Sequence, residues 1–320
     1  MNVYSARKCC RGARPGAAAR VLRACRLLVF CALASIGFSV SAHSADLGDD
    51  SAKAASTWPT TYLDLRTNYA TLTANTLSIG FSNPSLSSVL AALQSLQTLT
   101  NSPALPARSL PSSRSLGVDV PLTVDLDQFS LYGGFSGTTS QAGQSDWSAF
   151  MVTSWNVGFQ ADLYKQNGGS IPTITLQSTF TRAVPDSPLA TSSLNTVVES
   201  SYALNTDETK GLLAGVQYTM VAIDSSLAAI SPNIIGYVGG YYQWDNNWKV
   251  TGRAGVQSFG GAQLLSLTPF PAFTQPIVRF DLDRMDDNDN RLFGVTAEIA
   301  WTPKPAYELT IRTPLYLVRH

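Results

Sequence analysis

The chain has 320 residues, with 22 basic and 22 acidic side chains that leave no net charge at neutral pH. Only 14% of its residues are charged, whereas an average soluble domain carries about a quarter, so we expect something other than water to face much of the surface. No stretch beyond residue 42 approaches about 18 consecutive apolar residues, which excludes membrane-spanning helices from that part of the chain.

The first 42 residues have the pattern of a secretory signal peptide. A basic region precedes an apolar run from Leu27 to Val40, which is short for a membrane anchor because an anchor needs about 20 apolar residues. Small residues in Val40-Ser41-Ala42 predict cleavage after Ala42, with Ala45 as the second option and an uncleaved anchor as the disfavoured alternative. The basic region contains Arg7, Lys8, Arg11, Arg14, Arg20, Arg23 and Arg26.

Removing this segment changes the chemistry of the mature chain. The segment carries all four cysteines, so the mature protein has no thiol for disulfides, nucleophilic catalysis or metal binding. It also removes 7 basic and no acidic residues, which leaves 15 basic against 22 acidic residues, a net charge of −7. This acidic balance argues against nucleic acid and anionic lipid headgroups as partners. The cysteines are Cys9, Cys10, Cys25 and Cys31.

Beyond the signal segment, apolar and polar residues alternate with period two in segments of about ten residues, which is typical of membrane β-barrel strands. The clearest segment runs from Trp147 to Leu163. Twelve such segments predict an all-β, closed antiparallel transmembrane barrel, since bacterial single-chain barrels have even strand numbers. The predicted strands are Leu63–Tyr69, Val118–Leu126, Phe129–Ser136, Trp147–Leu163, Thr173–Phe180, Val198–Leu204, Leu212–Ala222, Ile234–Trp244, Trp248–Ser258, Ile277–Arg284, Leu292–Trp301 and Tyr307–Val318.

The connections support this count. We expect residues 43–60 to form a short periplasmic segment and residues 61–320 to form the barrel, with both ends on the periplasmic side. Short turns then fall on the periplasmic side and longer connections outside, and only Pro303–Pro305 breaks this rule. The predicted short turns are Asp127-Gln128, Gln166–Gly169, Asn205–Gly211, Asp245–Asn247 and Asp286–Asn290. The predicted long connections are Thr73–Gly117, Gly137–Asp146, Ala183–Thr196, Ile223–Asn233 and Phe259–Gln275.

The connection over residues 73–117 fits the scheme least well. An apolar run from Leu86 to Leu99 has helical spacing, and a Pro/Ser-rich passage follows it. Two interpretations remain open: a surface loop with one short packed helix, and a loop folded into the lumen that narrows the pore. An extra strand over Leu77 to Phe81 would disturb the strand count.

The mature chain contains only two histidines, His43 and His320, one at each end. Catalytic triads, histidine acid–base pairs and histidine metal sites need an imidazole held in a pocket, so we expect no enzymatic activity, metal or cofactor. The run from Asp286 to Asn290 looks like a calcium loop but lacks the glycine at the sixth position. We therefore interpret it as a polar turn.

If the apolar face of each strand meets lipid, nine acidic and five basic side chains face the lumen. An excess of carboxylates raises the local cation concentration in a confined pore, which predicts a preference for cations, divalent metal ions included. The alternative is that these groups pair across strands and brace the lumen without selecting ions. The predicted lumen residues are Asp64, Arg66, Asp119, Asp125, Asp162, Glu199, Lys249, Arg253, Arg279, Asp281, Asp283, Glu298, Glu308 and Arg312.

Outward aromatic residues sort to the two predicted rims. Tyr242, Trp244 and Trp248 fall at the periplasmic rim, while Trp147 and Trp301 fall toward the outer one. This sorting is typical of the aromatic girdles at membrane interfaces. A soluble sandwich has no need for it, so the pattern favours a membrane barrel.

The chain resembles Gram-negative outer-membrane β-barrels of the porin and small-channel kind, through its signal segment, its amphipathic segments from Tyr62 to Val318 and its closing strand from Tyr307. The resemblance implies an outer-membrane channel for passive diffusion of small polar solutes or cations, inserted by the barrel-assembly machinery into lipid. A monomer and a homo-oligomer both stay open as its assembly. One alternative is a non-conducting structural or surface-interaction barrel. An autotransporter translocator is disfavoured, because almost no passenger precedes Tyr62 and the predicted helix follows the first strand.

Overall fold

The computed structural model describes the part of the chain predicted to form the barrel. The predicted signal peptide over residues 1–42, the segment over 43–59 and the predicted helix over 86–99 lie outside the described residues. Within those residues, no helix is long and apolar enough to cross a membrane. The described residues are 60–74, 81, 112–126, 128–166, 169–184, 190–224, 228–264, 271–286, 291–301 and 305–318.

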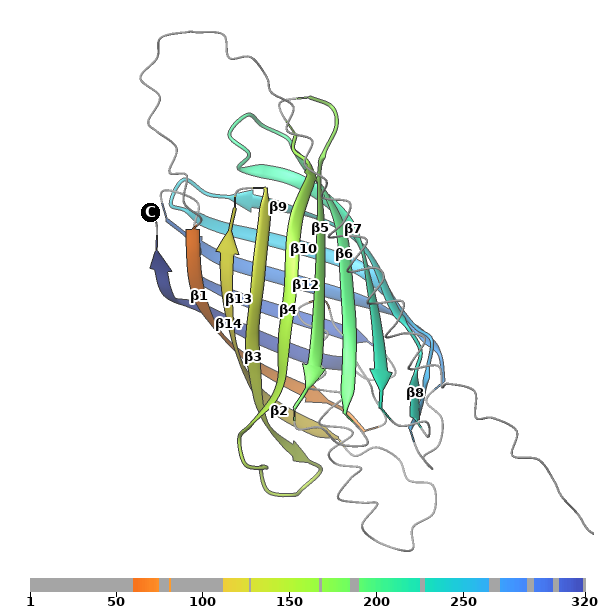
Figure 1. Cartoon of the computed structure of the whole chain (residues 1–320). Coiled ribbons are helices and arrows are strands. Elements are labelled where there is room, and N and C mark those ends of the chain that lie inside the picture. The colour runs from red at the N-terminus through yellow and green to blue at the C-terminus, as the bar shows by residue number, and fades with distance from the viewer. Residues whose placement is uncertain are drawn as a thin grey trace, which may run out of the picture. The chain divides into compact units, whose positions relative to one another are not determined.

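Twelve antiparallel strands close into one barrel, which confirms the predicted fold class and strand number. Each predicted strand overlaps one strand of the barrel. Figure 1 shows that the strands of the front wall and those of the back wall run in different directions, as expected for strands tilted against a barrel axis. The strands are β1 (Thr60–Leu72), β2 (Ser113–Asp125), β3 (Phe129–Ala142), β4 (Met151–Tyr164), β5 (Thr173–Ala183), β6 (Thr191–Ala203), β7 (Lys210–Ile223), β9 (Asn233–Gln243), β10 (Trp248–Phe259), β12 (Phe273–Met285), β13 (Arg291–Trp301) and β14 (Pro305–Val318).

The barrel strands form a meander that closes on itself. Each strand pairs with the next barrel strand in the chain, and β1 pairs with β14 to complete the circle. Closure leaves no sheet edge, so the backbone N–H and C=O groups find partners on both sides. In the closing seam, Thr61 lies opposite Val318, which places both ends of the described chain at the same end of the barrel.

Two further strands correct the expectation of simple loops over residues 223–233 and 259–275. The three-residue strands β8 (Ala228–Ile230) and β11 (Ala262–Leu264) pair with each other as a separate two-stranded sheet. They belong to the β7–β9 and β10–β12 connections, which flank the neighbouring strands β9 and β10 on the same side. Three residues are too few to show a hydropathy period, so alternation did not reveal them.

Several strands extend further than predicted at the ends that face the long connections. β2 begins at Ser113, inside the predicted loop over residues 73–117, and β6 begins at Thr191 rather than near Val198. β3 likewise continues to Ala142. The extensions of β3 and β6 carry Ser and Thr on both faces, so hydropathy stops alternating while the backbone pairing continues.

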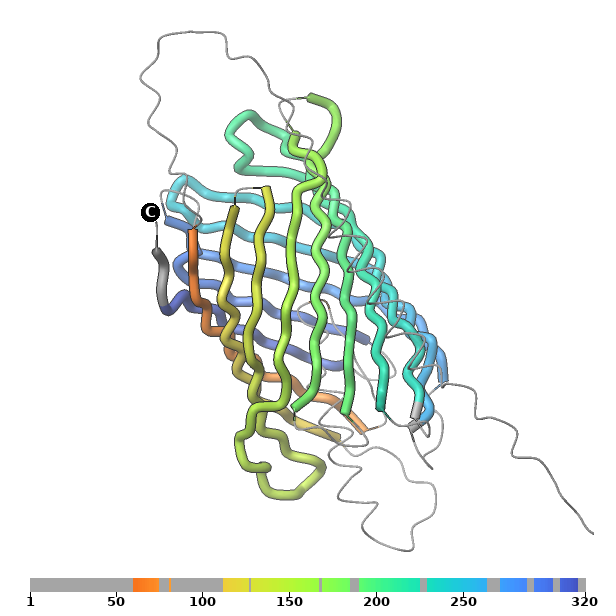
Figure 2. The backbone as a smooth tube through the Cα atoms, in the orientation of Figure 1, coloured from red at the N-terminus to blue at the C-terminus, as the bar shows by residue number. Residues whose placement is uncertain are grey.

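The predicted strand over residues 147–163 starts too early. β4 begins at Met151, and the residues from Gly143 to Phe150 form the end of the β3–β4 hairpin. Figure 2 shows this hairpin extending beyond the neighbouring strands. The backbone N–H of Ser148 donates to the carbonyl of Ser140 and the Thr139 hydroxyl donates to the carbonyl of Ser148, so local bonds close the hairpin outside the barrel ladder.

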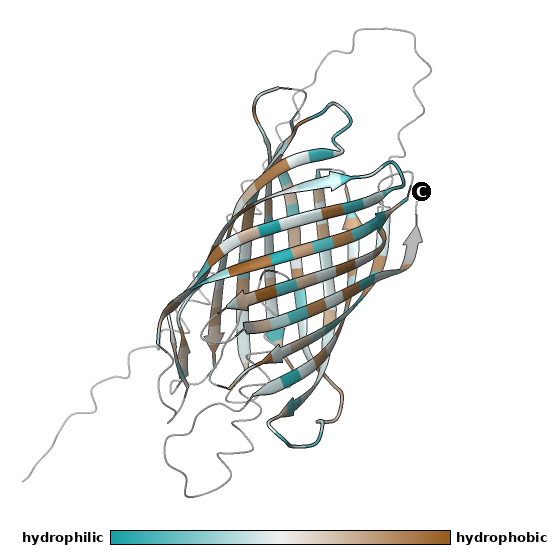
Figure 3. Ribbon diagram, turned by 180° about the vertical axis from the view of Figure 1, so that it is seen from behind, coloured by the Kyte–Doolittle hydropathy of each residue, from teal (hydrophilic) through white to brown (hydrophobic). Residues whose placement is uncertain are grey.

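The two faces of the barrel wall differ sharply in polarity. The outward residues Val238 and Phe280 are 64% and 55% exposed, whereas the inward residues Gln217 and Gln257 are at most 1% exposed. Figure 3 shows apolar and polar residues alternating along the strands. An exposed apolar belt around a closed barrel is what the hydrocarbon of a bilayer solvates, so the barrel is a transmembrane one.

Aromatic residues stand near both ends of this belt. At one end, Tyr242 and Trp244 pack edge to face with ring centroids 5.3 Å apart, and the Arg284 guanidinium lies 5.8 Å from the Trp248 ring centroid. Toward the other end, Trp301 closes β13 and is 43% exposed. Indole and phenol rings of this kind suit the interface between hydrocarbon and headgroups.

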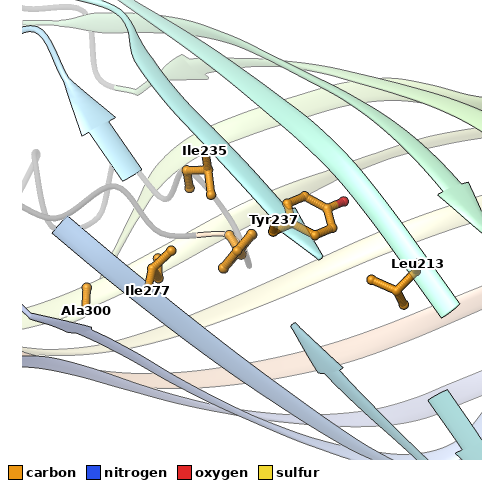
Figure 4. Packing of buried hydrophobic residues seen from close by; sticks show 6 residues of the cluster. Leu213, Ile235, Tyr237, Ile277 and Ala300 are labelled. Atoms are coloured by element: carbon orange, nitrogen blue, oxygen red, sulfur yellow. The ribbon is translucent and has the colours of Figure 1, made fainter. Parts of the chain in front are cut away.

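A small apolar core lies inside the barrel, on the wall made by β7, β9, β12 and β13. Figure 4 shows Leu213, Ile235, Tyr237, Ile277 and Ala300 gathered on the inner face of these strands. Phe81 joins the cluster from the β1–β2 connection and is only 7% exposed. Phe81 itself belongs to no strand, and residues 77–80 of the possible extra strand lie outside the described residues.

Candidate functional site: the barrel lumen

An internal cavity of about 770 Å³ is lined by side chains from strands around the barrel wall. Uncharged polar groups, among them Tyr62, Tyr132, Gln160 and Gln177, line it together with charged ones. A cavity of this volume is large enough for a small solute with part of its hydration shell. The lumen is therefore the candidate functional site.

All fourteen predicted lumen residues lie in the part of the chain that the structure describes. Three of the carboxylates are almost completely buried in the wall: Asp281 (5% exposed), Asp283 (6%) and Glu298 (4%). Three others are placed by single contacts or register: Asp162 accepts from the Thr175 hydroxyl at 3.0 Å, Lys249 Nζ lies 4.8 Å from the Tyr241 ring centroid, and Glu308 lies opposite Glu298. The remaining eight line the cavity: Asp64, Arg66, Asp119, Asp125, Glu199, Arg253, Arg279 and Arg312.

Four charged residues form one row across neighbouring strands. Glu308 on β14 lies opposite Glu298 on β13, which lies opposite Arg279 on β12, which in turn lies opposite Arg253 on β10. Like charges are therefore direct neighbours at both ends of the row. Such neighbours repel each other unless groups of opposite charge reach them from adjacent rows.

For the arginines, Asp281 and Glu199 provide that compensation. Arg253 Nη1 donates to Asp281 Oδ2 at 2.8 Å, and Arg279 Nη2 donates to Asp281 Oδ1 at 2.7 Å. On its other side, Arg253 Nε donates to Glu199 Oε2 at 3.1 Å. The Tyr237 hydroxyl also donates to Glu199 Oε2, at 2.7 Å. Asp281 and Glu199 are thus tied into a network with the two arginines, which is the kind of contact that the cross-strand pairing alternative describes.

Arg291 is a lumen cation that the sequence prediction missed. Its Nε donates to Asp283 Oδ1 at 2.7 Å, and its side chain lines the cavity. The β12–β13 register shifts between Arg284 and Met285, and Met285 pairs with Arg291. A shift of one residue reverses which face a side chain takes. Arg291 precedes the predicted strand, which begins at Leu292, and alternation extended back from Glu298 would have turned it outward.

Phe81 is held inside the barrel by a polar and an aromatic contact. Its backbone N–H lies 3.0 and 3.1 Å from the two carboxylate oxygens of Glu298. Its ring meets the Tyr237 ring edge to face, with centroids 5.0 Å apart. Periodicity gave no signal for this residue, because it lies in a connection and not in a strand.

An uncharged polar ladder also crosses the inner wall, on strands β6, β7, β9, β10 and β12. The Thr219 hydroxyl donates to Asn195 Oδ1 at 3.0 Å, and the Gln257 amide donates to Asn233 Oδ1 at 2.8 Å. The Gln275 amide donates to Gln257 Oε1 at 2.6 Å. These residues were missed because the prediction selected charged side chains only, although their inward parity was readable from the sequence.

Among the described residues, no three histidine, cysteine, aspartate or glutamate side chains stand close enough together to hold a metal ion. The expectations of no metal, no cofactor and no catalytic residue stay predictions. The described part of the lumen offers charge pairs, amides and phenols around a cavity of about 770 Å³, which is chemistry suited to binding polar solutes weakly.

No protein-family model matches the sequence, and no curated protein is significantly similar to it. The solved structures that it resembles are outer-membrane channels and autotransporter translocator barrels. An outer membrane channel from Pseudomonas putida F1 aligns at a TM-score of 0.47 and 9% identity, over 84% of this chain and 100% of that one. The transport unit of the autotransporter AIDA-I from Escherichia coli aligns at 0.45 and 11% identity, over 88% and 96%. The translocator domain of the autotransporter NalP from Neisseria meningitidis aligns at 0.41 and 10% identity, over 92% and 96%. Likenesses of this size carry no information on what passes through the barrel.

Proposed function

We propose that this protein is an outer-membrane channel through which small polar solutes diffuse down their concentration gradient. The observation that carries the proposal is a closed barrel that is apolar outside and encloses a polar cavity of about 770 Å³. Export through the predicted signal peptide and insertion by the barrel-assembly machinery belong to the same proposal. Lipid is then its permanent surroundings, and a homo-oligomer stays open as its assembly.

The proposed mechanism needs no energy source. A solute that enters the cavity exchanges part of its hydration for hydrogen bonds with groups such as Tyr132, Gln177 and Asn195, all of which line the cavity. Because these groups already bond to one another, as Tyr132 does to Thr179 at 2.6 Å, each contact with a solute is weak. Weak contacts let the solute leave as readily as it enters, which passive conduction requires.

We further propose a modest preference for cations, divalent metal ions included. With Arg291 added, nine lumen carboxylates stand against six lumen cations, so the fixed charge remains acidic. Fixed carboxylates favour cations in a confined pore. The preference is modest because pairs such as Arg253–Asp281 and Arg291–Asp283 neutralise part of that charge.

A second candidate is a non-conducting barrel with a structural or surface-interaction role. It is favoured by the packing of the inner wall, where Ile235, Ile277 and Gln257 are 0% exposed and Phe81 is inserted against Tyr237. In this case the cavity ends inside the barrel and solutes do not cross. The two candidates differ in one measurable property, permeability.

Swelling of proteoliposomes tests the channel proposal with uncharged solutes. Vesicles that contain the folded barrel are diluted into isotonic arabinose, a disaccharide or a tetrasaccharide, and light scattering follows their swelling. The channel predicts fast swelling in arabinose and progressively slower swelling in the larger sugars. If the vesicles swell in every sugar no faster than vesicles without protein, the non-conducting barrel is favoured.

A further inference from the structure

Two arginines face each other across the closing seam of the barrel. Arg66 on β1 lies directly opposite Arg312 on β14, and both line the cavity. Side chains directly opposite each other in an antiparallel pair have Cβ atoms about 5 Å apart. Like charges at this spacing repel each other, so the arrangement is unfavourable unless an anion lies between or beside them.

Within the described residues, the carboxylates near this pair lie closer to Arg66 than to Arg312. Arg66 Nη2 lies 3.6 Å from Asp64 Oδ2, and Asp119 is its cross-strand neighbour on β2. Arg312 forms no hydrogen bond or ion pair with a described residue, and its buried Nε has no partner. Nε of Arg66 is buried and unpartnered as well.

The wider surroundings of Arg312 are also basic. Its largest electrostatic interactions are with three arginines, Arg279, Arg66 and Arg291, ahead of the interaction with the carboxylate of Asp281. Asp281 is already committed, because it accepts hydrogen bonds from Arg253 and Arg279. A partly buried guanidinium whose Nε is buried without a partner is costly, and a bound anion would reduce that cost.

We propose that Arg312 and Arg66 form a binding subsite for small oxyanions in the lumen, which takes the carboxylate or phosphate group of a passing solute. The planar guanidinium offers paired N–H donors that match two oxygens of such a group, which a spherical anion does not use in the same way. The subsite deepens the proposed function and rests on it, because a solute reaches Arg312 through the lumen. A cation preference of the whole pore is compatible with one local anion subsite.

Single-channel recording with defined anions tests the subsite. In potassium chloride at constant ionic strength, added phosphate or acetate should interrupt the current in a saturable way, whereas replacement by further chloride should not. If only acetate acts, the subsite is specific for carboxylates; if only phosphate acts, it is specific for phosphates. Currents that phosphate and acetate leave unchanged relative to chloride would overturn the proposal.

Three variants connect the effect to Arg312. Arg312→Gln should raise the oxyanion concentration needed for half-maximal interruption about tenfold or more, as expected from loss of a charge-assisted hydrogen bond. Arg312→Lys keeps the positive charge but loses the paired N–H donors of the guanidinium. The oxyanion concentration that it needs for half-maximal interruption should therefore lie between those of wild type and Arg312→Gln. Arg284→Gln is the matched control, since Arg284 stacks on Trp248 away from the cavity, and should behave as wild type. Wild-type interruptions in Arg312→Gln would contradict the assignment.

A second measurement does not depend on conduction. The thermal unfolding midpoint of the detergent-folded barrel is compared in phosphate and in chloride at equal ionic strength. Wild type and Arg284→Gln should gain more from phosphate than Arg312→Gln does, because a ligand that binds the folded state stabilises it. If phosphate raises the unfolding midpoint only when Arg312 is present, and the protein carries no current in the bilayer, the channel proposal is overturned and the subsite is retained. Equal gains in all three proteins, in phosphate and in a parallel comparison with acetate, would overturn the subsite alone.

Discussion

At the scale of single residues, Asp281 joins three strands of the inner wall. It accepts hydrogen bonds from Arg253 on β10, from Arg279 on its own strand and from the Thr296 hydroxyl on β13 at 2.5 Å. The carboxylate is 5% exposed, so these donors replace water almost completely. Its role is therefore to hold two neighbouring arginines together in the wall.

We predict that Asp281→Asn destabilises the barrel by about 3–5 kcal/mol, because breaking a buried pair leaves an uncompensated charge. The denaturant midpoint of the protein refolded into lipid vesicles measures this. Asp146→Asn, on the exposed end of the β3–β4 hairpin, is the control and should change stability by less than about 0.5 kcal/mol. Equal midpoints for the two variants would show that the network does not support the wall.

Phe81→Ala should increase single-channel conductance, because it removes a ring that packs against Tyr237 inside the lumen. It should also cost about 3 kcal/mol of stability, as for other buried phenylalanines. Phe135→Ala is the control, since Phe135 is 63% exposed on the outer face and has no part in the passage. Conductance of Phe81→Ala equal to that of Phe135→Ala would mean that Phe81 does not narrow the path.

At the scale of strands, inward tyrosines lie over glycines of the neighbouring strand. Tyr237 on β9 lies opposite Gly215 on β7, and Tyr132 on β3 lies opposite Gly158 on β4. A Cβ added at Gly215 would stand 2.5 Å from the Tyr237 hydroxyl oxygen. The missing side chain therefore makes room for the ring, which in turn positions the hydroxyl that donates to Glu199.

Gly215→Ala should therefore destabilise the barrel by about 1–3 kcal/mol, as overpacking does. Gly236→Ala is a close control on the next strand, since nothing lies within 4 Å of an added Cβ there. It should be neutral or stabilise by about 0.5–1 kcal/mol, because alanine restricts the unfolded chain. Matched thermal unfolding midpoints measure the difference, and an unchanged midpoint for Gly215→Ala would contradict the packing role of the glycine.

Strand positions were predictable from the sequence wherever one face of the strand must meet lipid. The requirement makes outward residues such as Val238 apolar and produces the alternation. The alternation is lost at Thr191–Ser193, where three hydroxyl residues follow one another, and it fails at Arg291, where a register shift changes the face. The pairs inside the lumen were not predictable in detail, because they depend on the barrel's stagger, which brings Arg253 to Asp281 and Glu199 together.

At the scale of the whole molecule, the closed wall and the polar interior carry the functional proposal. Parity assigned the charged residues of the predicted lumen set and could have assigned the uncharged ladder through Gln257 as well, whereas it gave no signal for the insertion of Phe81. Phe81 comes from a connection with no period of its own, and the amides of the ladder were left out because only charged side chains were selected. Of these two features, Phe81 lines the cavity, whereas Gln257 is buried in the wall.

Current through a planar bilayer under a potassium chloride gradient tests the central claim most directly. A channel predicts stepwise conductance. The excess of lumen carboxylates predicts a reversal potential with the same sign as the equilibrium potential of potassium. A reversal potential set by chloride would contradict the charge argument while leaving the channel in place. The complete absence of conductance steps from correctly folded, inserted protein would contradict the channel itself.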